Sequence, residues 1–569
     1  MPSWTAHYDS HVPATLSPYP EKTLVDYLRE NVAAAPSAPA VLFKGSVLSY
    51  GDLDRLSDRF AVALAGMGIQ RGDRVALVLP NCPQFLITEL GAWKAGATVL
   101  PLNPLYTGIE LAEPLRASGA KVAVVLTPFY HRLKDVQAQT AVERIVATSI
   151  KEYLPPRLRI LFTLFKERKG GHRIQLRPGD AWLQHGLRES NPHRTFPGTT
   201  TGPAPDEDAI MLLSGGTTGT PKAVPGKHRH LVAAGLQLKA WLNPPGDVRD
   251  IALLPLPLFH VYACVGAQSH ALVSGTPLAL VPNPRDLQDL LKTIEHVKPT
   301  LFSAVPALFI ALLNDPKVQA RRVDFSSIRA CFSGAAPLMA ATKSRFEDLS
   351  GGRIVEGYSL TEAMMACVVN PLNGINKLGS VGIPLPDVEV AIVESESGDR
   401  FLPQGETGEI LLRAPQLMTG YWNSPDESAR ALRVHGEGGR WLHTGDLGYL
   451  DRDGYLFVVD RQKDLIKTSG YQVWPREIEE ALALHPAVLD VGVAGISDQI
   501  KGEAVKAWVV RRPGSTVTAE ELRVFCRSKV APFKVPAQIE FRQSLPKTMA
   551  GKVLRRALVA EHDETSAAR

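Results

Sequence analysis

The sequence lacks the features that define several classes of protein. Its 63 basic and 58 acidic side chains nearly cancel, and a net charge of +5 over 569 residues gives no reason to expect a nucleic-acid partner. No internal repeat is visible, and residues 1–7 hold no basic stretch followed by an apolar one, so no signal peptide is expected. Cysteines are few, scattered and never at metal-ligand spacing, as expected for reduced, mostly buried thiols of a cytoplasmic protein: Cys82, Cys264, Cys331, Cys367 and Cys526.

One segment contains no charged residue but does not read as a membrane helix. Residues 251–284 lack Asp, Glu, Lys and Arg over a length that exceeds the ~20 residues a membrane span needs. Prolines interrupt it at positions 255, 257, 277, 282 and 284. We predict a strand over 251–254, a buried helix over 261–273 and a strand over 278–281, all inside the protein.

The remaining chain has an ordinary globular composition and is long enough to form several domains. Apolar strands alternate with helical patterns from 40 to 126 and again from 286 to 335, which predicts parallel sheets covered on both faces. Beyond about 380 short strands and tight turns predict a small β unit. From about 464 a helix opening at Pro475 and a capping box at Thr518 predict a compact α+β unit.

A glycine- and threonine-rich loop follows the apolar run 210–213. Glycine lets backbone amides approach an anion, the hydroxyls donate hydrogen bonds, and the lysine adds a positive charge, so the loop suits a polyphosphate. Thr220 and Pro221 separate the last glycine from the lysine, which is not the spacing of a P-loop. Alone, such a loop is more often a plain turn. Its residues are Ser214, Gly215, Gly216, Thr217, Thr218, Gly219, Thr220, Pro221 and Lys222.

Four further segments add chemistry to this loop. Residues 333–337 are small and follow a strand, where a flat ring could lie against the backbone. Residues 356–362 supply an aromatic ring, hydroxyls and Glu362, a carboxylate suited to Mg²⁺. Asp446 could bind a ribose diol, with Arg461 as a second contact. Residues 546–556 place Lys552 in a glycine-containing turn. Taken singly, each of these residues has an ordinary structural explanation.

With all five motifs in the same order, the sequence resembles the acyl-adenylate-forming superfamily of acyl-CoA synthetases, coumarate–CoA ligases, luciferases and adenylation domains. The likeness runs from about 22 to 560. It implies an α/β and α+β multidomain fold: a large N-terminal domain (1–462) with two covered, mainly parallel sheets and a β subdomain near 380–460, then a mobile C-terminal domain (463–569). It also implies ATP and Mg²⁺ as reagents. A carboxylate attacks the α-phosphate of ATP to give acyl-AMP and pyrophosphate, and a thiol then displaces AMP.

The resemblance also implies a role for each residue. Lys222 and the loop 214–220 would hold the β- and γ-phosphates, Glu362 the metal, and Thr361 the α-phosphate. Lys552 would lie where the substrate carboxylate meets the α-phosphate, because two anions need a cation between them. The other implied positions are the nucleotide contacts Gly334, Ala335, Ala336, Gly357, Tyr358, Ser359, Asp446, Arg461 and Gln472, the catalytic candidate Lys467, the hinge Lys463, and the CoA-tunnel residues Ser469 and Gly470.

The sequence determines the choice of acid substrate less closely than it determines the reaction. Residues 257–262 resemble the family segment beside the acyl pocket, and His260, Val261 and Val265 are the candidates, followed by small residues that leave room for a long chain. No aspartate stands there to receive an amino group, and the chain ends soon after Lys552, so no carrier domain is expected to follow. The likeness is greatest to bacterial long-chain fatty acid–CoA ligases. A ligase for aryl or medium-chain acids, and a ligase that loads a carrier protein, are the alternatives.

Residues 150–169 have a composition suited to an anionic membrane surface. Six basic and two acidic residues surround a cluster of Leu, Ile and Phe. We expect peripheral association through this segment, which would help to collect insoluble fatty acids. A helix that packs on the large domain with a basic outer face is the equally weighted alternative.

Overall fold

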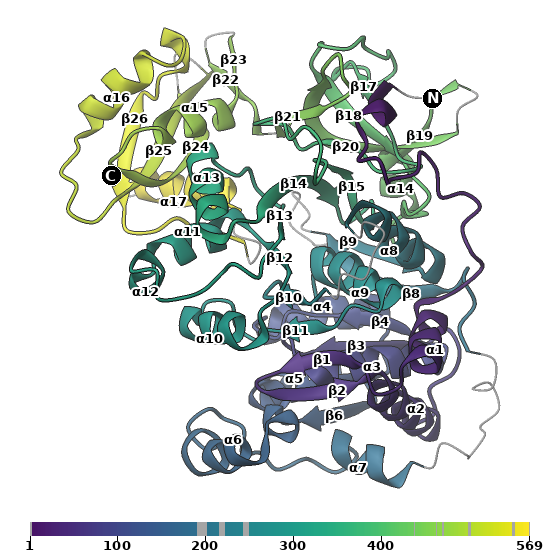
Figure 1. The fold of residues 1–569 in the computed structure, drawn as a ribbon. Coiled ribbons are helices and arrows are strands. Elements are labelled where there is room, and N and C mark those ends of the chain that lie inside the picture. Colours follow the sequence, from purple (N-terminus) through teal and green to yellow (C-terminus); the bar gives the residue numbers. More distant parts are fainter. Residues whose placement is uncertain are drawn as a thin grey trace.

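The computed structural model describes residues 3–190, 202–214, 222–242, 250–436, 439–461, 464–468, 471–498, 502–548 and 552–567. Its strands form four sheets. The two larger sheets fill the body of the molecule, and the two smaller sheets lie on either side of its upper end (Figure 1).

The largest sheet has nine strands in the order β16-β15-β14-β13-β12-β10-β11-β1-β2. Its central strands run parallel, while β2, β15 and β16 pair in antiparallel fashion at the edges. The strands are β1 (Pro39–Phe43), β2 (Ser46–Ser49), β10 (Ala252–Leu254), β11 (Leu278–Leu280), β12 (Leu301–Ala304), β13 (Ala330–Ser333), β14 (Arg353–Leu360), β15 (Met365–Val369) and β16 (Ile383–Pro384).

The second large sheet has the order β7-β6-β5-β3-β4-β8-β9, and only its last pair, β8 with β9, is antiparallel. Its strands β4 and β5 are buried at every residue because helices cover both faces of the sheet. The strands are β3 (Arg74–Val78), β4 (Thr98–Pro101), β5 (Val122–Leu126), β6 (Arg144–Thr148), β7 (Ala181–Trp182), β8 (Asp208–Ser214) and β9 (Lys222–Lys227).

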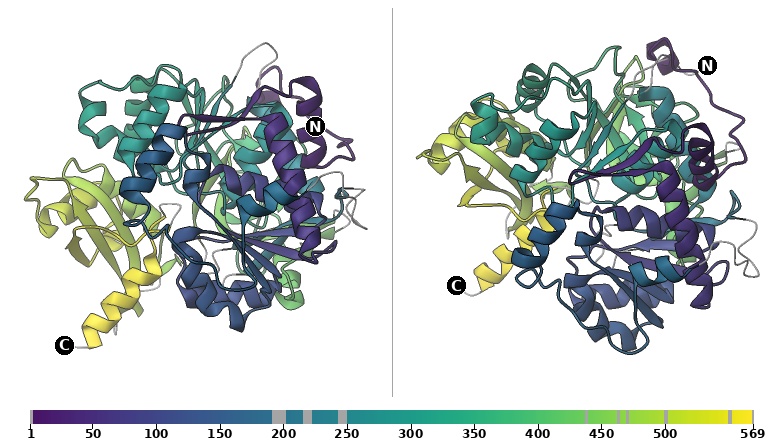
Figure 2. Two further views of the ribbon diagram at one scale, coloured as in Figure 1. Left: turned by 90° about the horizontal axis from the view of Figure 1, so that it is seen from below. Right: turned by 60° about the horizontal axis from the view of Figure 1, so that its bottom comes forward.

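Helices cover these sheets, as Figures 1 and 2 show from three sides. Every residue of α3 is buried, including the polar side chains of Gln84, Thr88, Glu89 and Lys94, so this helix lies inside the protein. Thr23, Ser49 and Thr107 form capping boxes that fix the starts of α1, α2 and α4. The helices are α1 (Leu24–Ala34), α2 (Tyr50–Gly66), α3 (Pro83–Lys94), α4 (Gly108–Ser118), α5 (Tyr130–Val136), α6 (Pro156–Leu161), α7 (Leu183–Glu189), α8 (His228–Leu242), α9 (Gln268–Ser274), α10 (Leu287–Val297), α11 (Pro306–Asn314), α12 (Pro316–Gln319) and α13 (Ala340–Ser350).

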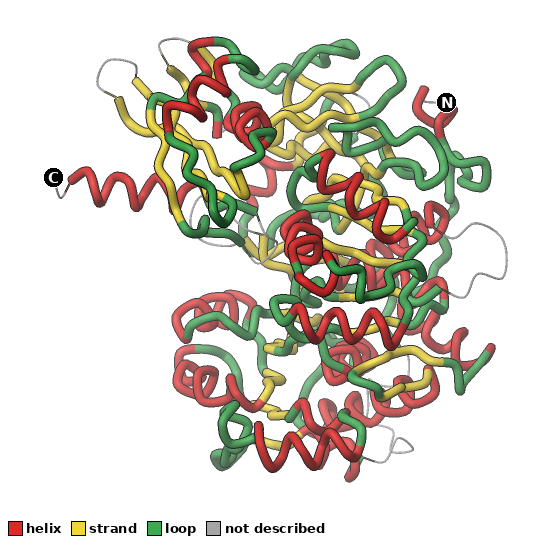
Figure 3. Tube along the Cα trace, turned by 60° about the vertical axis from the view of Figure 1, so that its left-hand side comes forward, coloured by secondary structure: helices red, strands yellow, loops and turns green. Residues whose placement is uncertain are grey.

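The two smaller sheets contain the later part of the chain. The first has the order β17-β18-β20-β19, with β21 also on β20: β17 (Glu389–Val393), β18 (Gly408–Arg413), β19 (Leu432–Val434), β20 (Arg440–Leu450) and β21 (Leu456–Arg461), with α14 (Pro425–Ala431). The second has the order β23-β22-β25-β24, with β26 on β25. Its elements are β22 (Ile466–Thr468), β23 (Tyr471–Val473), α15 (Pro475–Ala483), β24 (Val488–Asp498), β25 (Gly502–Arg511), α16 (Ala519–Arg527), β26 (Gln538–Arg542) and α17 (Arg555–Ala567). Figure 3 shows α17 projecting from the body.

The predicted fold class is confirmed, and the differences are local. The uncharged segment is interior, as expected, but its helix is a π-helical stretch (Tyr262–Ala267) that continues into α9. Short strands are expected beyond about 380, but β20 is long, because ladders with β18, β19 and β21 extend it through the polar residues 443–446. All five cysteines are buried. Among the described residues no helix is both long and apolar enough to cross a membrane.

Candidate functional site

Two neighbouring strands of the largest sheet place the predicted nucleotide residues side by side. Ser333 at the end of β13 pairs with Glu356 in β14, so residues 334–336 follow at the carboxyl edge beside Gly357. Ala335 has a φ of 67°, a left-handed turn that redirects the chain at this edge. A Cβ on Gly334 would lie 3.2 Å from the ring of Tyr262. Glycine therefore lets the edge approach this buried ring closely.

The predicted ribose and adenine residues are linked directly. The Tyr358 hydroxyl donates a hydrogen bond to Asp446 Oδ2 at 2.7 Å, and both residues are buried. The long strand β20 carries Asp446 and pairs it with Arg461 of β21. Asp446 N also donates to Thr444 Oγ1 at 3.1 Å. The fold thus brings together Tyr358, Asp446 and the backbone of Arg461 from two sheets.

The candidate metal carboxylate lies in a tight turn. Thr361 and Glu362 follow β14, and Met364 N donates to Thr361 O at 3.1 Å to close the turn toward β15. Glu362 Oε1 accepts a hydrogen bond from the Tyr421 hydroxyl at 2.9 Å, and Met418 N donates to Glu362 O at 2.9 Å. Burial and the nearby Glu362 charge raise the pKa of Tyr421, which keeps it a hydroxyl donor. A half-buried carboxylate oriented in this way is the kind of hard oxygen ligand that Mg²⁺ takes.

Lys222, the cation of the glycine-rich loop, opens strand β9. Its ammonium group lies 4.9 Å from the centre of the Tyr421 ring and forms an ion pair with Glu427 of α14. Arg430 donates to the other oxygen of Glu427 at 3.0 Å. The Glu427 carboxylate is therefore placed between two cations, and their charges hold its pKa below the ordinary value, with the Lys222 hydrogen bond as the main cause.

A polar cavity of about 370 Å³ opens beside this group. Lys222, Tyr421, Glu427, Arg430 and Thr444 line it. It is large enough for several phosphate groups, and it borders the strand that carries Asp446. Its wall also contains His443, whose Nδ1 lies 2.8 Å from Glu409 Oε2 and whose Nε2 lies 2.9 Å from His435 Nε2.

Sequence reasoning missed Tyr421, Glu427, Arg430, Glu409 and His435. A signal was present in residues 420–425, where two aromatic residues stand among Gly, Asn, Ser and Pro, a composition typical of an ordered loop that carries function. Among the described residues no group of three or more His, Cys, Asp or Glu could hold a metal ion. A site built on Glu362 would therefore complete its coordination with substrate phosphates and water.

The three acyl-pocket candidates lie on the π-helical segment and the turn before it. Val261 and Val265 are buried. His260 is partly buried, and the loss of solvent around its ring lowers its pKa. Met365 fills the space beside this segment, since a Cβ on Gly266 would come within 2.6 Å of its Cε and Sδ atoms. The space beside the small residue Gly266 is therefore occupied by the side chain of Met365 from β15.

Two hydrogen bonds join Lys552, the predicted catalytic lysine, to Thr548. Thr548 N donates to Lys552 O at 2.8 Å, and Lys552 N donates to Thr548 Oγ1 at 3.1 Å. Lys547 pairs with Asp490 at 2.5 Å within the same small unit. Lys467 is exposed on β22, and its backbone N–H donates to Glu503 at 2.6 Å.

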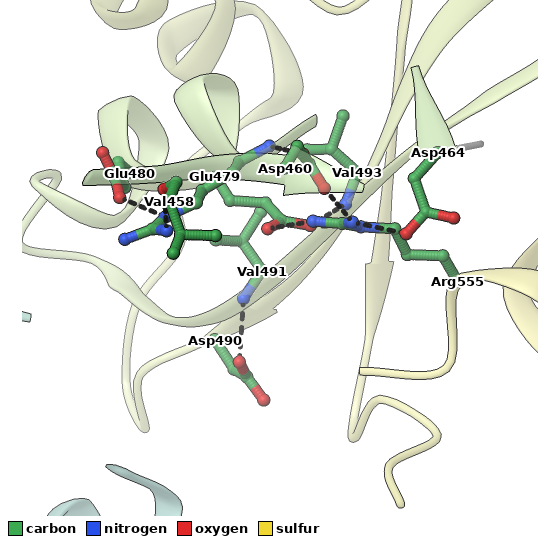
Figure 4. Close-up of polar contacts among 10 residues, drawn as sticks. Val458, Asp460, Asp464, Glu479, Glu480, Asp490, Val491, Val493 and Arg555 are labelled. Atoms are coloured by element: carbon green, nitrogen blue, oxygen red, sulfur yellow. Dashed lines mark hydrogen bonds and ion pairs between the residues drawn. The ribbon is translucent and has the colours of Figure 1, made fainter. Parts of the chain in front are cut away.

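Arg555 connects this unit to the strand that enters it. Its guanidinium contacts Asp460, Asp464 and Glu479 (Figure 4), at 2.9 Å from each aspartate and 2.8 Å from the glutamate. Arg476 N also donates to Asp460 at 3.0 Å. Some predicted positions lie outside the described residues: Gly215, Gly216, Thr217, Thr218, Gly219, Thr220, Lys463, Ser469 and Gly470.

Comparison with known proteins gives consistent results. The family model "AMP-binding enzyme" matches residues 28–422, and "AMP-binding enzyme C-terminal domain" matches residues 477–552. The long-chain-fatty-acid–CoA ligase of Bacillus subtilis (strain 168) is 39% identical over 563 residues, covering 99% of this chain and 98% of that protein. The enzyme of the same name from Escherichia coli O6:H1 is 34% identical over 567 residues, covering 98% and 97%.

Solved structures share the fold over nearly the whole chain. The anthranilate CoA ligase AuaEII with anthranoyl-AMP gives a TM-score of 0.83 at 26% identity, covering 98% of this chain and 100% of that one. ATP-bound MatB from Rhodopseudomonas palustris gives 0.80 at 26% identity, covering 95% and 99%. Apo MatB gives only 0.71 at the same identity and coverage. By TM-score, the structure of this chain is therefore more similar to ATP-bound MatB than to apo MatB.

Proposed function

Because this chain belongs to the AMP-binding enzyme family, we propose that it activates a long-chain fatty acid with ATP and transfers the acyl group to CoA. The chain is an acid–thiol ligase of the AMP-forming type, with fatty acid, ATP and CoA as its substrates. In the first half-reaction a carboxylate oxygen attacks the α-phosphorus and pyrophosphate leaves. In the second, the CoA thiolate attacks the acyl carbon and AMP leaves.

We assign a step of this reaction to each of the described site residues. Lys222 takes the β- and γ-phosphates in the polar cavity, while Asp446 accepts from the ribose hydroxyls with Tyr358 holding its carboxylate in place. Thr361 donates to the α-phosphate from the turn after β14. Residues 334–336 form the edge against which the adenine lies. These are positioning and charge-neutralising roles, as phosphoryl chemistry requires.

Glu362 would hold Mg²⁺, which supplies charge neutralisation on the phosphates when bound. Tyr421 orients one oxygen of this carboxylate at 2.9 Å. Lys552 would carry its charge to the point where the fatty-acid carboxylate meets the α-phosphate. The two half-reactions need different groups at one centre, so we place a domain boundary at 462/463 with Lys463 as the hinge. Rotation about this hinge would bring Lys467 and Gln472 to the centre in turn. We place Ser469 and Gly470 beside the CoA thiol.

The observation that carries this proposal is one connected group: Tyr421 joins Glu362 to Lys222 beside a cavity, and Asp446 lies on a strand at its border. The test is pyrophosphate release from ATP over a panel of acids, with and without CoA. We expect release that depends on a long-chain acid and acyl-CoA only when CoA is present. Release that requires no acid would contradict the proposal.

Residues 150–169 supply a surface for the insoluble substrate. In α6 and the turns that follow, five apolar side chains are exposed: Leu158, Ile160, Leu161, Leu164 and Phe165. Exposed bases flank them: Arg157, Arg159, Lys166, Arg168 and Lys169. The inner face is held by Phe162 packed edge-on against His172 and by a Lys151–Glu167 ion pair at 2.6 Å. An apolar strip between cations fits the surface of an anionic bilayer, so we assign this face to peripheral membrane contact.

A further inference from the structure

Tyr421 lies between the two groups that would receive ATP and its metal. Its hydroxyl donates to Glu362 Oε1 at 2.9 Å, and its ring faces the Lys222 ammonium at 4.9 Å. Neighbouring contacts fix the loop that carries it, because Tyr421 N donates to Ser428 Oγ at 2.8 Å and Trp422 N donates to Ala223 O of β9 at 2.9 Å. One side chain thus sets the spacing between the phosphate-side cation and the metal-side carboxylate.

Glu427 occupies the position that an anionic ligand would take. One carboxylate oxygen pairs with Lys222 and the other accepts from Arg430 at 3.0 Å. Lysine and arginine side chains converging on one anion are the arrangement that binds a phosphate group. Both cations and the carboxylate line the 370 Å³ cavity, and Glu427 lies at the edge where its side chain is 39% exposed. It therefore has room to swing into solvent.

We propose that Glu427 is a displaceable counter-ion that holds Lys222 until a polyphosphate arrives, and that Tyr421 is the residue that positions Lys222 and Glu362 for the same ligand. The proposal rests on the assignment of Lys222 to the ATP phosphates. The terminal phosphates of ATP displace the carboxylate, and Lys222 and Arg430 transfer to them. When pyrophosphate departs, the ion pair between Glu427 and Lys222 forms again. No covalent bond changes in this exchange.

A structural role and a counter-ion role for Glu427 predict opposite changes in ligand affinity when the residue is replaced. A residue that merely stabilises the fold weakens ligand binding when it is replaced. A competing counter-ion strengthens binding when it is replaced, because the ligand no longer breaks an ion pair to enter. The gain is limited to about two- to fivefold, the range of an exposed ion pair.

The test for Glu427 is equilibrium binding by calorimetry, with ATP, pyrophosphate and AMP as separate ligands and no fatty acid. Glu427→Gln should bind ATP and pyrophosphate about two- to fivefold more tightly and AMP unchanged, since AMP lacks the terminal phosphates. Asp426→Asn is the matched control, because this exposed neighbour carries the same charge in the same helical turn. Weaker ATP binding by Glu427→Gln, or equal tightening by Asp426→Asn, would overturn the proposal.

The test for Tyr421 separates its ring from its hydroxyl. Tyr421→Phe keeps the ring beside Lys222 but loses the donor to Glu362, so the Mg²⁺ concentration needed for half-maximal ATP binding should rise about five- to tenfold while metal-free ATP binding holds. Tyr421→Leu should weaken ATP binding in both conditions. Equal losses for Tyr421→Phe with and without Mg²⁺ would contradict the positioning role. Failure of the proposed function would show as no ATP binding by the unaltered chain, which is a different outcome.

Discussion

Arg555 Nη1 lies 2.9 Å from Asp460 Oδ1 and so joins the first turn of α17 to the last strand before the predicted hinge. The same guanidinium pairs with Asp464 and with Glu479 (Figure 4). Arg555 is only three residues beyond Lys552. The lysine turn is thereby tied to both sides of the position at which we expect the domain to rotate.

Arg555→Ala should lower the stability of the C-terminal unit and slow acyl-AMP formation. The side chains of Arg555 and Asp460 are 15% and 4% exposed, and removing one partner from a buried group of charges typically costs about 3 kcal/mol or more. Thermal unfolding and acid-dependent pyrophosphate release measure the two effects. Arg556→Ala is the control, because this neighbour is exposed. Equal losses in both variants would argue against a role for the ion pairs.

Lys552→Ala should nearly abolish acyl-AMP formation. The loss of one well-placed electrostatic donor costs about 3–4 kcal/mol, or several hundredfold in rate. Thioester formation from prepared acyl-AMP and CoA should stay within about tenfold. Lys547→Ala serves as the control, since Lys547 pairs with Asp490 in its own unit. A variant that fails equally in both half-reactions would mean that Lys552 has a structural role only.

Charge reversal at Arg157, Arg159, Arg168 and Lys169 should abolish co-sedimentation with anionic liposomes, because each base near the surface contributes about 1 kcal/mol. Activity on a short soluble acid should remain. Reversal at Arg321 and Arg322, which are exposed elsewhere, is the control. Replacement of Leu164 and Phe165 by Ser tests the apolar half of the surface, and binding that survives both sets of changes would exclude this segment.

kcat/KM should rise with chain length of the acid, by about fourfold for each methylene that becomes buried at ~0.8 kcal/mol. Gly266→Val should reduce the rate with long acids more than with short ones, because the added side chain would clash with Met365 and force it to move beside the candidate acyl pocket. Steady-state kinetics over a series of saturated acids measures both. A maximum at acetate or at an aromatic acid would contradict the long-chain assignment.

Stability should fall as pH rises between about 6.5 and 8, through Glu89 in α3. Below 6.5 the buried His228, His230 and His270, whose pKa values burial lowers, make stability rise with pH and oppose Glu89. Burial raises the pKa of Glu89 to about 8, and the buried Oε1 atoms of Glu89 and its partner Gln268 have no hydrogen-bond partner, so the protonated form fits the site. In the folded state Glu89 keeps its proton, whereas in the unfolded state it loses the proton above its ordinary pKa of 4.5. This difference lowers the free energy of unfolding by about 1.4 kcal/mol for each pH unit in this window. Glu89→Gln should flatten the slope in denaturant unfolding from about pH 6.5 to 8. An unchanged slope would show that Glu89 titrates normally.

Local preferences in the sequence were sufficient for much of the fold. The alternation of strands and helices, the capping box at Thr518 and the proline that opens α15 all predicted elements where they occur. The order of five motifs identified the family. Backbone propensity, capping and apolar spacing act between residues that are close in the sequence. They can therefore be recognised without knowing how the elements pack.

Only the tertiary structure decided which distant side chains meet. Tyr421 reaches Glu362 across 59 residues, Lys222 reaches Glu427 across 205, and Tyr358 reaches Asp446 across 88. The sequence of 150–169 allowed either an inward or an outward apolar face, and its packing against His172 turned the apolar residues outward. Such contacts depend on how sheets and loops are placed against one another, and no local pattern encodes that placement.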